Sequence, residues 1–93
     1  MREIDLALYA DALAGEASSL AARIEREHGR LRQASVEKAA RKELPEVVVA
    51  RLEELGLLGT HADVEVLAEL EEALDAVEAL QAWVEAQLSR VAA

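Results

Sequence analysis

The chain has 93 residues and a net charge of −9, and 53% of its residues are apolar although it contains no Phe, one Trp, one Tyr and no Cys. This length predicts a single domain, residues 1–93, with a thin core. The acidic balance argues against nucleic acid and anionic membranes, because both favour clusters of Lys and Arg. The lack of Cys excludes disulfides, thiolate metal sites and a cysteine nucleophile.

The start of the chain predicts a soluble, cytoplasmic protein. Glu3 and Asp5 lie where a signal peptide needs basic residues followed by an apolar run. No segment approaches the roughly 18 uninterrupted apolar residues that a membrane span requires.

A three–four rhythm of mainly apolar residues predicts a long first helix over about residues 5–42, with Asp5 as its N-cap. The row consists of Ala10, Leu13, Ala17, Leu20, Ile24, Glu27, Leu31 and Ala34. Gly15 and Gly29 each disfavour a helix by up to about 1 kcal/mol relative to Ala. A break near Gly29 therefore stays open.

Pro45 ends the first helix and suits the first turn of a short second helix over about residues 45–55. Gly56 can adopt the left-handed conformation that closes a helix. Leu57 then folds back towards Leu52, as in a Schellman motif. Thr60 or Asp63 is the expected cap of the next helix.

The third helix is expected over about residues 63–91, and its apolar positions form an almost continuous stripe. The stripe consists of Leu67, Leu70, Leu74, Val77, Gln81, Val84, Leu88 and Val91. Further apolar residues lie beside it and behind it, namely Val66, Ala73, Leu80, Ala79, Ala82, Trp83 and Ala86. Apolar residues on several faces require more than one partner helix.

These elements predict an all-α fold: an antiparallel hairpin of two long helices with a short helix between them, dimerising into a helical bundle. Residues 21–44 carry a net charge of +3 and residues 62–93 a net charge of −7. We expect the two segments to pair within the hairpin, with an external anionic partner as the alternative. The expected pairs join Arg30, Arg32, Lys38 and Arg41 to Glu65, Glu69, Glu71 and Glu72.

Two sets of residues are candidates for assembly. The predicted subunit interface comprises Leu80, Trp83, Val84, Leu88 and Val91. The row of the first helix and the stripe of the third are together called the seam, and Glu27 and Gln81 both lie on it. We expect them to meet in a polar core layer that sets the register of the two helices. Small residues between positions 14 and 22 favour a close helix crossing, most naturally with a second copy.

The pair Glu25-x-x-His28 resembles the Glu-x-x-His motif that ferritin-like bundles use to hold iron. Residues three apart share a helix face, and a carboxylate with an imidazole suits a first-row metal. The helix at residues 63–91 offers no further His, so a solvated His28 is the preferred interpretation. No metal and no cofactor are predicted.

The segment from Val47 to Leu58 resembles the ends of recognition helices in winged-helix regulators over about a dozen residues. Such a helix reads DNA with Arg, Lys, Asn or Gln near its start, whereas this one offers only Arg51 among acidic neighbours. No wing hairpin follows. A transcriptional regulator is therefore the third hypothesis.

No nucleophile–base pair or phosphate-binding loop is visible in the sequence. We expect a non-enzymatic helical interaction or assembly protein (an adaptor, chaperone-like or regulatory subunit) that acts as a homodimer or higher homo-oligomer. A metal-binding half-bundle built on Glu25 and His28 is the alternative.

Overall fold

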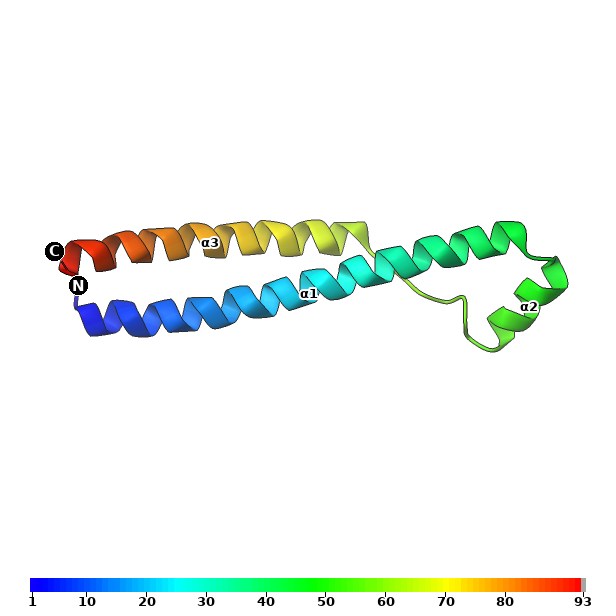
Figure 1. Ribbon diagram of the computed structural model, residues 1–93, viewed down its shortest axis with the longest axis horizontal. Coiled ribbons are helices and arrows are strands. Elements are labelled where there is room, and N and C mark those ends of the chain that lie inside the picture. The colour runs from blue at the N-terminus through cyan, green and yellow to red at the C-terminus, as the bar shows by residue number, and fades with distance from the viewer. Residues whose placement is uncertain (93) are drawn as a thin grey trace.

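The computed structural model describes residues 1–92 as three helices: α1 (Glu3–Glu43), α2 (Glu46–Glu54) and α3 (Val64–Ala92). Figure 1 shows α3 running antiparallel beside the first part of α1, with α2 at the far end and both chain ends together at the other. The molecule is a rod of 70 × 18 × 15 Å. Its two short dimensions are those of a single pair of packed helices. The all-helical prediction is confirmed, as is the packing of the first helix on the third.

The first helix differs from the prediction at its start and agrees with it in extent, and the open question of a break near Gly29 is resolved. It begins at Glu3 after Arg2, which makes no side-chain cap, so Asp5 lies inside the first turn. The two acidic residues of this first turn, Glu3 and Asp5, still stabilise the helix, because they lie at the positive end of its dipole. The helix also passes through Gly29 without a break, because its seam remains packed on both sides of that residue.

The sequence signals at both ends of α2 are confirmed apart from a one-residue shift. Leu44 is extended before Pro45, as a residue preceding proline prefers, and α2 starts at Glu46. Gly56 has a φ of 73°. The Leu57 amide donates to the Leu52 carbonyl at 3.0 Å, which is the Schellman bond expected from the sequence.

The predicted seam forms the core of the hairpin. Leu6, Leu13 and Val84 are buried together, and Ala10, Val77, Leu80 and Leu88 pack against them. Leu20, Leu67 and Leu70 are also buried. The three–four rhythm therefore identified the faces by which α1 and α3 pack.

The segment between α2 and α3 returns along the second half of α1, which holds it with three side chains. Arg41 donates to the Leu58 carbonyl. Thr60 donates its hydroxyl to Glu37 at 2.9 Å. The Asp63 amide donates to Glu27 at 3.0 Å.

The start of α3 is therefore fixed from two sides. Asp63 Oδ1 accepts the amides of Glu65 and Val66 at 2.9 and 3.3 Å, which makes Asp63 the N-cap that the sequence indicated. Its own amide is satisfied by Glu27, a side chain that is only 7% exposed. Glu27 is thus an acceptor that docks α3 on α1.

This contact sets a register different from the predicted one. Glu27 lies beside Asp63, and Gln81 is 18 residues further along the chain, about 27 Å away in a helix. The predicted Glu27–Gln81 layer is therefore wrong. The extended return segment occupies the far part of α1, so α3 starts only near Glu27.

The predicted charge pairing fails for the same reason. Arg32 pairs with Glu25 inside α1, and Arg41 pairs with Glu53 of α2. Most of the basic segment of α1 lies beyond the reach of α3. Within residues 1–92 a contact between α1 and α3 joins His28 Nε2 to Glu71 Oε1, at 3.6 Å.

Candidate interaction surfaces

The hairpin leaves an unusually large surface exposed. Its accessible area is 6811 Å², whereas a compact 10.1 kDa protein exposes about 5,300 Å². Its radius of gyration is 21.1 Å, against about 12 Å for a compact chain of this length. Two helices bury one stripe on each helix and leave the remaining faces open.

The predicted interface residues divide between the core and the surface. Val84 is 1% exposed between α1 and α3, so it belongs to the hairpin core and cannot meet a partner unless the hairpin opens. Leu80 and Leu88 pack at the edge of this core. Trp83 and Val91 remain outside, at 48% and 44% exposure.

An open hollow of about 360 Å³, here called the terminal hollow, lies near the chain ends. It is lined mainly by apolar surface from Met1, Asp5, Leu6, Tyr9, Leu80 and Trp83. These include the only Tyr and the only Trp of the chain, both about half exposed. An aromatic pair with a carboxylate beside it suits a cationic group that carries an apolar stem.

A second, polar hollow of about 200 Å³, here called the central hollow, lies where α3 begins. Its lining consists of Arg23, Arg26, Glu27, Arg30, Val66 and Leu70. Arg30 contacts Glu27 at 3.2 Å. Arg23 and Arg26 form no ion pair or side-chain hydrogen bond with any part of residues 1–92.

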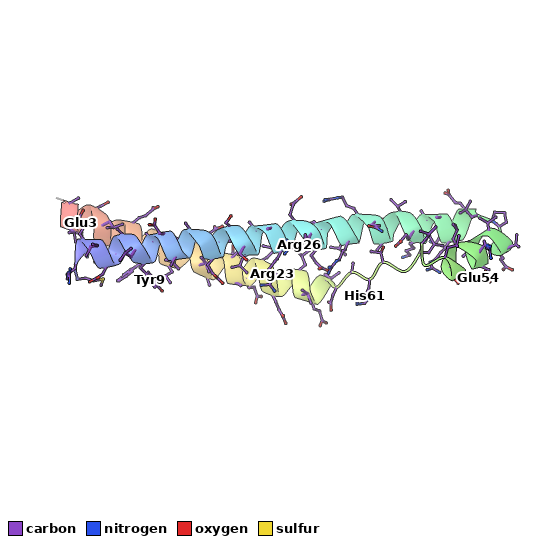
Figure 2. All side chains as sticks on the ribbon, turned by 90° about the horizontal axis from the view of Figure 1, so that it is seen from below. Glu3, Tyr9, Arg23, Arg26, Glu54 and His61 are labelled. Atoms are coloured by element: carbon purple, nitrogen blue, oxygen red, sulfur yellow. The ribbon has the colours of Figure 1, made fainter. Side chains whose placement is uncertain are left out.

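Both hollows lie on one side of the hairpin. Tyr9 and Arg23 are 14 residues apart, close to four helical turns, and therefore share a side of α1. Val66 and Leu80 have the same spacing on α3. Figure 2 shows Tyr9 towards the chain ends and Arg23 and Arg26 near the middle of the rod.

We call this side the flank. It comprises Asp5, Tyr9, Ala12, Glu16, Ser19, Arg23, Arg26 and Arg30 of α1 and Val66, Ala73, Ala76, Leu80 and Trp83 of α3. Between the hollows, four of its five residues are Ala or Ser. The apolar pattern of the sequence indicated Trp83 and Leu80 as surface contacts, but it did not indicate Tyr9, Arg23 or Arg26. The signal that was available is the seven-residue spacing from Tyr9 to Glu16, Arg23 and Arg30, directly beside the seam.

The candidate metal ligands contact different partners. Glu25 pairs with Arg32 at 3.8 Å, and its side chain is 75% exposed. His28 contacts Glu71 of α3. Within the described part of the chain, no three His, Asp or Glu side chains are grouped in a way that suits a metal ion.

The short helix α2 places its one basic residue in an ion pair. Arg51 contacts Glu54 at 3.0 Å, one turn further along the helix. Around it, Val47, Leu55 and Leu57 are largely exposed at the far end of the rod. The one basic group of α2 is thus paired within its own helix, on exposed surface.

None of the helices in residues 1–92 is both long and apolar enough to cross a membrane. Comparisons of the chain with protein families, with curated proteins and with solved structures find no match.

Proposed function

We propose that this protein is a non-enzymatic helical assembly protein, of the adaptor or regulatory-subunit kind, which acts as a homodimer through the flank. The observation that carries the proposal is the excess of exposed area. The chain exposes about 1,500 Å² more than a compact protein of its mass. Folding a single hairpin does not remove this area from water, whereas association does.

The excess of exposed area is of the size that a dimer interface buries. If each of two chains buries about 1,500 Å², the total is about 3,000 Å², within the range of obligate homodimers. A two-hairpin assembly is a four-helix bundle, in which each helix contacts two neighbours. This arrangement supplies the second partner that the apolar residues beside the stripe of α3 require.

The chemistry of the flank supports it as the contact surface. The half-exposed rings of Tyr9 and Trp83 are of the kind that anchors interfaces, because they bury much area for little loss of side-chain entropy. The small residues Ala73 and Ala76 let a second pair of helices approach closely. The far end of the rod stays outside such an interface.

Size-exclusion chromatography with light scattering at micromolar concentration tests the proposal. We expect a species of twice the 10.1 kDa chain mass. Trp83→Lys should shift it to monomer. Ala82→Lys is the matched control, because this exposed residue lies about 100° around the helix from Trp83. A fully helical wild-type monomer at these concentrations would overturn the proposal.

A further inference from the structure

Resting on the proposed homodimer, we infer that the two chains pair in antiparallel orientation, so that Arg23 and Arg26 of one copy enter the terminal hollow of the other. The contact occurs twice by symmetry. The terminal hollow is thus a receptor for guanidinium groups, and its occupant is a second copy of this chain.

The two hollows are chemically complementary. The terminal hollow offers two aromatic faces and the carboxylate of Asp5, which has only a long, exposed contact of 3.9 Å with Arg2 of its own chain. Guanidinium groups bind favourably over the faces of Trp and Tyr, and their aliphatic stems cover apolar surface. The central hollow offers the two arginines that have no ionic partner within residues 1–92.

The spacing along α1 fits a two-fold axis between the hollows. Tyr9 and Arg26 lie symmetrically about a point between Ala17 and Ser18, and so do Asp5 and Arg30. An axis that crosses α1 there therefore brings each aromatic end against the basic region of the partner. The small residues around the axis, which predicted a close helix crossing, offer little steric obstruction to it.

The parallel alternative brings like charges together. In a parallel face-to-face dimer the two central hollows adjoin, so six arginines gather at one level of the bundle with only the two Glu27 carboxylates to offset them. Like charges in contact oppose association and disfavour that orientation. The terminal hollows then also face each other, and their carboxylates have no cation from the partner.

Antiparallel pairing also predicts the shape of the dimer. The axis falls near the middle of the region covered by α3, whose 29 residues span about 44 Å. Most of this region overlaps in the dimer, and the two far ends, each with its α2, project in opposite directions. A pair of rods 70 Å long then spans about 95 Å, whereas a parallel pair stays near 70 Å.

Energy transfer between single-cysteine variants separates the two orientations, since the chain has no Cys of its own. Ser18→Cys places a label at the level of the axis but on an exposed side of α1 outside the flank, and Val47→Cys places one at the exposed far end. With mixed donor and acceptor chains we expect strong transfer at position 18 and none at position 47. Strong transfer at both positions overturns the antiparallel inference and leaves the homodimer intact. A monomer in light scattering overturns the homodimer itself.

A charge exchange tests the occupant of the hollow. Arg26→Glu and Asp5→Lys should each weaken dimerisation by about tenfold or more, because each contact occurs twice. The double variant should recover most of the affinity. Arg32→Glu, the same change on the opposite side of α1, is the matched control and should shift the dissociation constant by less than about twofold. Purely additive losses in the double variant, or an equal loss in the control, would show that the arginines do not occupy the hollow.

Discussion

Replacing Glu27 by Ala tests how the hairpin holds its register. The Glu27 carboxylate is buried and accepts the Asp63 amide at 3.0 Å and Arg30 at 3.2 Å. Its removal leaves the amide at the start of α3 without an acceptor. The change should therefore weaken the docking of α3 as well as the overall stability.

The expected loss follows from these contacts. A hydrogen bond to a charged group contributes about 1.5–3 kcal/mol, and the lost methylene adds about 0.8 kcal/mol. We therefore expect Glu27→Ala to lower the free energy of unfolding by about 2–4 kcal/mol. Glu27→Gln keeps an oxygen for the Asp63 amide and loses the charge near the helix start, so its loss should be about 1 kcal/mol.

Urea denaturation followed by circular dichroism at a fixed protein concentration measures the loss. Hydrogen exchange of the Asp63 amide measures the local effect, and its protection should fall in the Ala variant more than in the Gln variant. Glu25→Ala is the matched control, because that carboxylate is exposed on the same helix. Its effect should stay within about 0.5 kcal/mol.

The reasoning is refuted if Glu27→Ala and Glu25→Ala lower stability equally. Unchanged protection of the Asp63 amide in the Ala variant would refute it as well, because the Glu27 contact would then not be holding the start of α3.

Two further substitutions test the core and the backbone, both by urea denaturation. Val84→Ala removes two methyl groups from the most buried site and should cost about 2 kcal/mol, whereas Val91→Ala, 44% exposed, should cost less than half as much. Gly29→Ala should stabilise the protein by about 0.5–1 kcal/mol, because an added Cβ meets only Arg32 Nη2 at 4.0 Å. The same exchange at Gly56 should destabilise it, because φ there is 73°.

Local and periodic features of the fold were predictable from the sequence. The rhythm of α3 identified its packing face, and Pro45, Gly56 and Asp63 marked helix boundaries through backbone chemistry that acts within a few residues. The start of α1 was misplaced, because Asp5 is favourable both as a cap and within a first turn. Propensity alone does not separate these two positions.

The register was not predictable, because it depends on how far the connecting segment travels. A helix advances about 1.5 Å per residue and an extended chain about 3.3 Å. The residues from Gly56 to Asp63 return along α1, and this places α3 opposite the first part of that helix. Glu27 was correctly singled out as a polar residue on the seam, but its partner is a backbone amide, which a side-chain pattern does not reveal.

The flank was missed because its residues are mixed in character. A stripe of apolar side chains gives a periodic signal, whereas Tyr9, Glu16 and Arg23 share a spacing without sharing polarity. Their relation becomes visible only once α3 places Leu80 and Trp83 beside the first of them. The predicted interface was drawn from α3 alone and so included Val84, which the hairpin itself covers.

A core this thin implies that folding and association are coupled. Seven apolar side chains of residues 1–92 are buried, and three of them, Leu6, Leu13 and Val84, form the central cluster. If the dimer supplies the remaining burial, the urea midpoint must rise with protein concentration, by about 1.4 kcal/mol of stability for each tenfold increase. Trp83→Lys should abolish this dependence and lower the stability, while Ala82→Lys should retain it. A midpoint independent of concentration in the wild-type protein would mean that the hairpin is stable by itself.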